Sequence, residues 1–592
     1  MKHFLKYVLA TVVGLVVAGI LMGIFSMLMF MGMAMGTSAP KVEENSVLVM
    51  KLDGTLSERA EENPFDMLMG GAGTSALSLE NMLKAVELAK ENENIKGLYV
   101  EAGMLSGASP AMLQELRDAI VDFKKDGKFV LSYGDTYTQG AYYVCSAADS
   151  VVVNPQGMVD WHGMSMQTMF FKDILDKLGV KVQVFKVGTY KSAVEPFIGT
   201  EMSDANREQM EVFTSEIWDE MLADVSESRK ISVEELNQVA DTVTLLCETS
   251  FYLDEKLVDK VAYSDEIPQM ICNMMDVDDE DDYNTITVNE MASIASNKPK
   301  DDSGNVVAVY YAYGDIVNTP SSGISSEEIA SSVVIRDLEE LAEDDDVKAV
   351  VLRVNSGGGS AYASEQIWHQ VMNIKSKKPI VVSMGGMAAS GGYYISCAAD
   401  YIFAEPTTLT GSIGIFGMIP EVSELVTEKI GLHSETVKTN KYADFGDLTR
   451  PMNEDEKAVM QASVNRGYEL FTKRCADGRG MEQDSIKAVA EGRVWTGLHA
   501  LELGLVDQLG GLDDAIAEAK KRAEIESCTV KSYPGTSSFI DKLSGAVGGD
   551  SYADAKMKEI LGDYYDTFSY MKRMATERGV MAKSPYTYRF GL

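Results

Sequence analysis

YYVCSAADSVVVNP, at residues 142–155, and YYISCAADYIFAEP, at residues 393–406, are two versions of one segment placed 251 positions apart in the same chain. The likeness continues upstream, where NIKGLYVEAG (94–103) corresponds to DVKAVVLRVN (346–355) at nearly the same offset. This period is far longer than the roughly 20–50 residues of a solenoid repeat. The sequence therefore predicts a domain that has been duplicated.

The two copies also indicate the domain boundaries. Apolar runs open them, VLVMKLDG in the first and VVAVYYAYGDI in the second, so we expect an N-terminal repeat at 46–272 and a C-terminal repeat at 306–535. The segment between them, 273–305, contains DVDDEDD and has no apolar periodicity, which predicts an exposed acidic linker. The tail at 536–592 has two helical stretches and no chemistry that can be named.

Strand and helix patterns alternate within each copy. In the second copy KAVVLRV is typical of a buried strand, residues 363–375 of a helix, KPIVVSM of a strand, residues 391–399 of a helix and DYIFAEP of a strand. These strands are continuously apolar rather than alternating, which indicates a parallel sheet covered by helices. Each repeat is therefore predicted to be an α/β domain with right-handed crossovers.

Composition excludes several classes of protein. The 592 residues carry 53 Lys+Arg against 90 Asp+Glu, and a formal charge of −37 gives no basic face for nucleic acid. Six scattered cysteines without a CxxC pair, and five histidines that are never within four residues of one another, fit neither a disulfide scaffold nor a zinc motif. We therefore expect no nucleic-acid partner, no metal and no cofactor.

The N-terminus predicts membrane attachment. Lys2 and Lys6 precede a strongly apolar stretch at 8–35, which has the length of a spanning helix rather than of a signal-peptide core. The positive-inside rule then places residues 1–7 in the cytoplasm and the remainder of the chain outside it. Cleavage by a signal peptidase near Ala39 is the alternative.

The two copies differ most where loops follow strands. NSGGGS (355–360) in the second copy replaces AGMLSGAS in the first, and MAASGGYY (387–394) replaces TYTQGAYY, so that Ser390 corresponds to Gln139. Copies of one fold need the same core, so differences confined to loops point to function. A serine at the start of a helix, beside a glycine-rich loop, can combine a nucleophile with backbone N–H donors for an oxyanion. The alternative is that Ser390 only caps the helix and the glycines only form a turn.

A nucleophilic serine needs a base. His369, His433 and His499 lie in the second copy, but none is in a recognisable Asp/His setting. A buried lysine with a lowered pKa can serve instead. In VGTYKSAVEPF of the first copy, Lys191 lies among small and apolar neighbours, although most single lysines are solvated surface residues.

At TYKSAVEPF, MAASGGYYIS, EPTTLTGSIGIFG and GRVWTGLHALELGLVDQLGG the chain resembles signal peptide peptidase A of the long, duplicated, membrane-anchored type, over about residues 46–535 and the N-terminal anchor. The resemblance implies tandem Clp-protease/crotonase-like domains and a Ser/Lys-dyad protease, with Ser390 as nucleophile and Lys191 as general base. It further implies degradation of remnant signal peptides and other unfolded peptides, a homotetramer, and an inner-membrane location with the catalytic domains on the periplasmic side.

One departure and one ambiguity accompany the resemblance. The family loop usually reads N-S-P-G-G, whereas this chain has Gly357 at the proline position. We expect a looser loop that still offers the N–H groups of Gly358 or Gly359, together with Gly391, to an oxyanion. Lys441, in KTNKYADFG, follows Ser390 at almost the spacing that separates Gln139 from Lys191, so it is the alternative base.

Two other classes of function remain open. An esterase is one, because AASGG approaches G-x-S-x-G, although Ala388 stands where the first glycine belongs and an acid and a histidine would be needed downstream. A non-catalytic membrane scaffold is the other. The TGSIGIF segment could also offer an edge to which an extended peptide adds as a strand.

Overall fold

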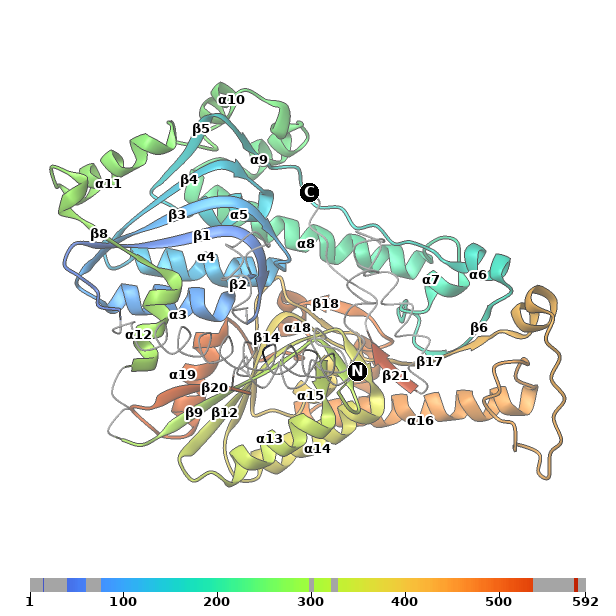
Figure 1. The fold of residues 1–592 in the computed structure, drawn as a ribbon. Helices are drawn as coiled ribbons and strands as arrows, with labels where there is room; N and C mark the ends of the chain where they lie inside the picture. Colours follow the sequence, from blue (N-terminus) through green and yellow to red (C-terminus); the bar gives the residue numbers. More distant parts are fainter. Residues whose placement is uncertain are drawn as a thin grey trace, which may run out of the picture.

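The computed structural model describes residues 40–59, 76–297, 303–320, 328–535 and 580–583, together with Gly14 (Figure 1). The predicted cytoplasmic end and anchor lie outside the described residues apart from Gly14, and so does the tail apart from residues 580–583. Within the described ranges, no helix combines the length and the apolar character needed to cross a bilayer.

The first half of the chain builds one parallel sheet. Its strand order is β2 (Ala76–Ser78), β1 (Ser46–Ser57), β3 (Ile95–Ser106), β4 (Phe129–Tyr137), β5 (Ser150–Val159) and β7 (Lys260–Val261). Every pairing in this order is parallel. The crossovers are the helices α3 (Leu79–Glu91), α4 (Pro110–Lys124) and α5 (Gln139–Cys145).

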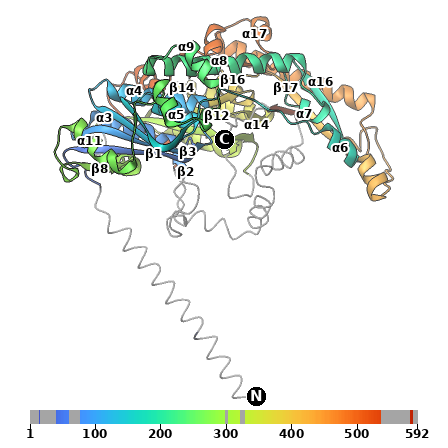
Figure 2. The ribbon, with the colours of Figure 1, turned by 90° about the horizontal axis from the view of Figure 1, so that it is seen from above.

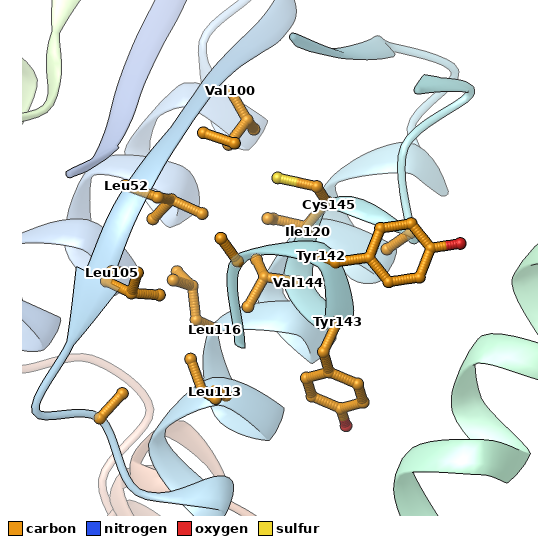
Figure 3. Close-up of a cluster of buried hydrophobic side chains, with 14 of the residues drawn as sticks. Leu52, Val100, Leu105, Leu113, Leu116, Ile120, Tyr142, Tyr143, Val144 and Cys145 are labelled. Carbon is orange, nitrogen blue, oxygen red and sulfur yellow. The ribbon is translucent and has the colours of Figure 1, made fainter. Parts of the chain in front are cut away.

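Helices cover both faces of this sheet, which explains its continuous apolar strands. On one face, Leu52 and Val100 of the strands pack with Leu116 of α4 and Tyr142 of α5 (Figure 3). Each fully buried side chain of this kind contributes about 1.5–3 kcal/mol to folding. The Tyr142 hydroxyl remains satisfied because it donates to Leu257 O at 2.9 Å. On the other face, α11 (Ile267–Met275) packs against the strands.

The second half repeats this architecture. Its strand order is β18 (Val494–Thr496), β16 (Leu409–Gly411), β14 (Ile380–Ala389), β12 (Val347–Ser356), β9 (Val306–Tyr313) and β20 (Thr529–Tyr533), while β15 (Tyr401–Ala404) pairs with β14 and β19 (Gln508–Leu509) with β15. All of these pairings are parallel except that of β16 with β18. The crossovers are α13 (Ser331–Glu343), α14 (Ala361–Lys375) and α15 (Gly391–Ser396), and α19 (Leu512–Arg522) covers the opposite face. The predicted α/β alternation and the parallel sheets are confirmed.

Two long helices also show the duplication. The helices α8 (Asp204–Arg229) and α16 (Glu454–Arg479) each have 26 residues and start at a side-chain cap, Ser203 and Asn453 respectively. Both end where the backbone turns left-handed, at Lys230 in one copy and at Gly480 in the other. Because the two helices have equal lengths and equivalent ends, they are equivalent elements of the two copies.

The remaining elements complete the two halves. In the first half they are α6 (Lys172–Leu178), β6 (Lys181–Val187), α7 (Glu195–Ile198), α9 (Val233–Ala240), η1 (Thr244–Leu246), α10 (Thr249–Asp254), η2 (Ser264–Glu266), η3 (Glu280–Asp282), β8 (Asn284–Thr287) and α12 (Val288–Asn297). In the second half they are β10 (Asp315–Val317), β11 (Glu328–Ala330), β13 (Gly358–Ser360), β17 (Ile415–Glu421), η4 (Leu425–Ile430), α17 (Gln483–Val489) and α18 (Gly497–Glu502). The tail adds β21 (Val580–Lys583).

The predicted acidic linker at 273–305 is wrong over much of its length. Strand β8 pairs in parallel with β1, and Ile286 is buried. Helix α12 then packs Met291 and Ala292 into the first core. The first domain therefore continues to about residue 297. A strand of four residues inside a charged stretch is too short to produce a recognisable apolar pattern, which is why the sequence did not reveal it.

A third sheet joins the two halves. Its strand order is β11, β10, β13, β21, β17 and β6, so it draws strands from the first half, the second half and the tail. Strand β6 of the first half runs antiparallel to β17 of the second, with Val187 opposite Ile415. In Figures 1 and 2, β17 lies beside α7, α6 and the end of α16, away from the first-half sheet. The residues that follow β6 therefore lie against the second half.

A buried ionic cluster also links the halves. Arg353 of β12 is 2% exposed and contacts Glu58 at 3.1 Å and Glu115 at 2.6 Å, both from the first half. Asn355, on the same strand, donates to Glu58 Oε1 at 2.9 Å and accepts from Met387 N at 3.1 Å. The cluster ties the interface between the copies to the loops at the ends of β12 and β14. None of the six cysteines, all of which lie in the described residues, forms a disulfide bond.

Candidate functional site

The loop after β6 carries Lys191 into the second half. Gly188 has a φ of 108°, and a methyl group in its place would meet Glu491 O at 2.3 Å. Tyr190 N donates to the same carbonyl at 3.0 Å. At Gly492 an added Cβ would lie 2.6 Å from Lys191 Cβ, so glycine permits this close approach. Glu491 and Gly492 of the second copy therefore contact the loop that carries the first copy's lysine.

Ser390 lies between the end of β14 and the start of α15. Its φ of 55° and ψ of −112° are unusual for a residue with a side chain, and its hydroxyl makes no capping bond to the helix. The N–H of Ser390 donates to Gly411 O at 2.8 Å, which holds the strained backbone. Strain of this kind concentrates at functional sites. The alternative of Ser390 as a side-chain helix cap is therefore wrong.

The first copy shows what replaced this arrangement. Thr138 caps α5 through its hydroxyl, which accepts from Ala141 N at 3.4 Å. Gln139, at the position of Ser390, accepts from the N–H groups of His162 and Gly163, each at 2.9 Å. In the first copy this position thus stabilises the start of a helix and the loop at His162 and Gly163.

Lys191 and Ser390 meet between the two copies. Lys191 Nζ donates to Ser390 Oγ at 2.7 Å, and Lys191 is completely buried. Burial lowers the pKa of the Lys191 amine from its ordinary 10.5 to about 7. At such a pKa about half of the lysine is neutral at pH 7 and can accept a proton.

Ser412 completes the surroundings of the amine. Lys191 Nζ contacts Ser412 O at 3.1 Å and Ser412 Oγ at 3.0 Å. The backbone of Ser412 is left-handed, with a φ of 49°, and its N–H donates to Arg493 O at 2.7 Å. Sequence reasoning missed this residue, although TGSIGIF was singled out as a strand edge. The flanking glycines indicate a tight turn, but nothing local reveals that its hydroxyl meets Lys191.

The glycine-rich loop reaches the same place. Gly358 has a φ of 100°, and a methyl group on it would stand 2.6 Å from Gly391 N, the first residue of α15. Strand β13 and the start of α15 are therefore adjacent. The N–H of Gly358 donates to Ser356 Oγ at 3.0 Å, so it is already engaged inside the loop. Of the three glycines predicted to offer oxyanion donors, this leaves Gly359 and Gly391.

The alternative base lies elsewhere. Lys441 is 60% exposed and pairs with Asp455, which raises its pKa. It lies in the second copy one residue before the position that the 251-residue offset gives for Lys191. Among the hydrogen bonds of the described residues, those of Ser390 Oγ involve Lys191 and no histidine. Lys441 is therefore not the lysine beside Ser390.

Comparisons with known proteins identify the class and then the family. Residues 318–409 match the Clp protease family, and residues 122–278 and 373–526 match peptidase family S49. The fold is Clp protease-like, the S49 domain is duplicated, and the chain is a serine protease. It belongs to peptidase family S49.

Curated relatives agree over most of the chain. Protease 4 of Salmonella typhi is 38% identical over 84% of this chain and 78% of that protein. Protease 4 of Haemophilus influenzae is 34% identical over 82% of this chain and 80% of that protein. The chloroplastic serine protease SPPA of Arabidopsis thaliana is 30% identical over 90% of this chain and 78% of that protein. The similarity is consistent with signal peptide peptidase A.

Proposed function

We propose that this protein is a membrane-anchored serine endopeptidase in which Ser390 is the nucleophile and Lys191 is the general base. The observation that carries the proposal is the 2.7 Å contact between Lys191 Nζ and Ser390 Oγ, made by a completely buried amine. Each half of the duplicated chain then supplies one member of the dyad. This division explains why Gln139 can stand at the serine position of the first copy.

The reaction begins with proton transfer. Neutral Lys191 takes the proton of Ser390 while Oγ attacks the carbonyl carbon of a peptide bond. The resulting ammonium remains held by Ser412 O and Ser412 Oγ, which accept its other protons. Lys191 then returns the proton to the leaving amine. Water hydrolyses the acyl-enzyme by the same relay in reverse.

Backbone N–H groups stabilise the oxyanion. Gly391 is the first residue of α15, where N–H groups lie at the positive end of the helix, and Gly359 lies on the adjacent strand β13. Both belong to the backbone and need no reorganisation during the reaction. A single donor of this type accounts for about 10²–10³ in rate.

Extended, unfolded peptides are the proposed substrates. An extended peptide can be held by main-chain hydrogen bonds to the sides of β13 and β17 that β21 occupies in this structure, which requires little sequence readout. A relative that is 36% identical over 42% of this chain carries the name putative signal peptide peptidase SppA, from Enterococcus faecium. We therefore propose remnant signal peptides, which are apolar and extended, as one substrate class.

Anchoring, location and assembly form part of the same proposal. The apolar stretch at 8–35, preceded by lysines, supports a single-pass anchor in the inner membrane with the protease domains on the periplasmic side. A homotetramer that encloses its sites would exclude folded proteins. Measuring the mass of the chain without residues 1–39 tests this assembly. That boundary keeps Val42, which is buried in the first core.

The catalytic assignment is tested by comparing Ser390→Ala with Ser376→Ala, a matched change at an exposed serine. Both full-length variants are expected to keep the wild-type circular dichroism and melting temperature. Only Ser390→Ala should lose hydrolysis of an unfolded peptide, by several orders of magnitude. Undiminished hydrolysis by a folded Ser390→Ala variant would refute the proposal. Loss of activity with a histidine-directed reagent would favour the esterase alternative.

A further inference from the structure

Arg493 of the second copy lies where the loop after β6 meets the second half. Its guanidinium lies between two aromatic rings, with Cζ 4.7 Å from the ring centroid of Tyr190 and 4.4 Å from that of Trp495. Nη1 donates to the Tyr190 hydroxyl at 3.1 Å, and Nη2 pairs with Glu208 Oε1 at 3.1 Å. Tyr190 directly precedes Lys191 in the chain. The side chain of Arg493 therefore holds the loop that carries the lysine.

The backbone of Arg493 supports the other side of the dyad. Arg493 O accepts from Ser412 N at 2.7 Å, and Ser412 in turn accepts from Lys191 Nζ through its carbonyl and its hydroxyl. A methyl group on Gly411 would stand 3.1 Å from Arg493 O, so the turn at 411–412 lies directly against this residue. Gly411 O accepts from Ser390 N at 2.8 Å. One residue thus contacts both the lysine loop and the turn that holds the serine.

Gln209 of α8 makes a second connection at the same place. This side chain is 1% exposed, and its Nε2 donates to Tyr190 O and to Ser192 Oγ, each at 3.1 Å. Its Oε1 accepts from Val494 N, the first residue of β18, at 3.2 Å. Both chain neighbours of Lys191 are therefore tied to β18, and the side-chain contact of Arg493 is the charged part of this connection.

We propose that Arg493 is a positioning residue for the dyad, whose side chain holds Tyr190 so that the Lys191 amine stays in its buried contact with Ser390. The inference rests on the proposed function of the dyad. A planar guanidinium with five N–H donors can lie between two rings and donate to a hydroxyl and a carboxylate at once, which the ammonium group of a lysine does not reproduce.

Burial gives this proposal a measurable consequence. Lys191 is completely buried, and this burial alone lowers the pKa of its amine. If the loop is released, water reaches the amine and its pKa rises toward the ordinary value. Loss of Arg493 is therefore expected to move the acidic limb of the rate profile to higher pH. A role confined to folding would lower the amount of active protein and leave the limb where it is.

The test compares Arg493→Met with Arg522→Met in the full chain purified in detergent. Arg522 of α19 is the matched control, because its Cζ lies 4.8 Å from the ring centroid of Tyr401 and its Nε pairs with Glu518 at 2.9 Å. Misplacement of a catalytic group by about 1 Å costs about 10² in rate, so kcat/KM for an unfolded peptide should fall by about this factor in Arg493→Met. Arg522→Met is expected to keep the wild-type rate and the wild-type pH profile.

Two results would overturn the inference. One is wild-type kinetics in Arg493→Met, and the other is a loss by the same factor at every pH. Arg493→Lys keeps the positive charge and is expected to lie between the wild type and Arg493→Met in both rate and pH profile. If the methionine variant does not fold, Arg493→Lys takes its place, and a wild-type profile in that variant refutes the need for the planar guanidinium.

A double-mutant cycle shows whether the effect passes through Tyr190. Tyr190→Phe keeps the ring and removes the hydroxyl that accepts from Arg493. It is expected to lower kcat/KM by about two- to tenfold in the wild type, the value of one hydrogen bond, and to cause no further loss in Arg493→Met. Equal losses in both backgrounds would refute transmission through this contact.

Hydrolysis of the same peptide by the wild type and by Ser390→Ala separates the two levels of the argument. If these two proteins cut the peptide equally, the proposed function is refuted together with the inference. If only the wild type cuts it and Arg493→Met matches the wild type at every pH, the inference is refuted and the proposed function stands.

Discussion

Protonation of Lys191 is expected to control both the activity and the stability of this protein. Only the neutral amine can accept the Ser390 proton, and the charged amine is buried without exposure to water. The perturbation is a change of pH, applied to the wild type and to Lys191→Met. Methionine keeps an unbranched side chain of similar length and removes the titrating group.

The effect on rate follows from the pKa of about 7 for the Lys191 amine. At that pKa roughly one-tenth of the amine is neutral at pH 6, about half at pH 7 and roughly nine-tenths at pH 8. We therefore expect kcat/KM to rise about tenfold from pH 6 to pH 8 and to level off above pH 8. Lys191→Met is expected to be inactive throughout.

The effect on stability has a defined sign. The pKa of about 7 in the folded protein lies below the ordinary 10.5, so the unfolded chain binds more protons between these values. The free energy of unfolding of the wild type, relative to Lys191→Met, should therefore rise as pH increases from 7 to 10.5. At about 1.36 kcal/mol for each pKa unit, the whole window corresponds to roughly 4–5 kcal/mol. Below pH 7 the full free-energy cost of burying the charged Lys191 amine lowers the stability of the wild type.

Two measurements check this prediction. Hydrolysis of an internally quenched peptide gives the rate profile from pH 5.5 to 10.5, and urea midpoints give the stability difference over the same range. Lys441→Met serves as the control, because it removes an exposed lysine that lies one residue from the corresponding position in the second copy. A rate that rises only near pH 10, with a stability difference that does not depend on pH, would show that Lys191 titrates as an ordinary lysine.

Three further outcomes are expected. Arg353→Met should lower the free energy of unfolding by about 3–5 kcal/mol, because it leaves two buried carboxylates without their cation. Urea unfolding measures this change, and a loss below about 1 kcal/mol, which is the value of a surface ion pair, would contradict it. Ser412→Ala removes an acceptor from the Lys191 ammonium, so the pKa of the amine should fall further. The acidic limb of the rate profile should then move to lower pH. An acidic limb at higher pH would be inconsistent with this role of Ser412. Gly391→Ala places a methyl group 2.8 Å from Ser364 Oγ and 3.0 Å from Ala582 O, so that it enters the space beside the Gly391 N–H. We therefore expect kcat/KM for peptides to fall about 10²-fold or more while the melting temperature changes little. Wild-type kinetics would show that the substrate does not use this space.

The architecture could be predicted from local sequence because most strands are continuous apolar runs bounded by polar segments. Continuous apolar runs such as KAVVLRV predict buried parallel strands, and the repeat at 142–155 and 393–406 predicts two domains of one fold. The edge strand β8 escaped notice because its four residues sit next to DVDDEDD, where charge hides a single buried isoleucine. Strand β21 escaped because its pairing partners lie more than 160 residues away in sequence.

The candidate site was predictable only in part. Comparison of the two copies singled out Ser390, since Gln139 stands in its place, and the surroundings of Lys191 matched a known family. The hydroxyl of Ser412 could not be predicted, because its contact with Lys191 exists only when β6 and β17 pair across the two halves. The N–H of Gly358 was equally hidden, because its bond to Ser356 depends on the conformation of the loop.

Activation of Ser390 by Lys191 is tested most directly by covalent labelling. The full chain is treated with a fluorophosphonate at pH 8, and the modified residue is located by peptide mapping. We expect Ser390 to be labelled in the wild type and in Lys441→Met, and to remain unmodified in Lys191→Met that keeps the wild-type fold. Labelling of Ser390 at the wild-type rate in Lys191→Met, or labelling of a different serine, would contradict a dyad formed between the two repeats.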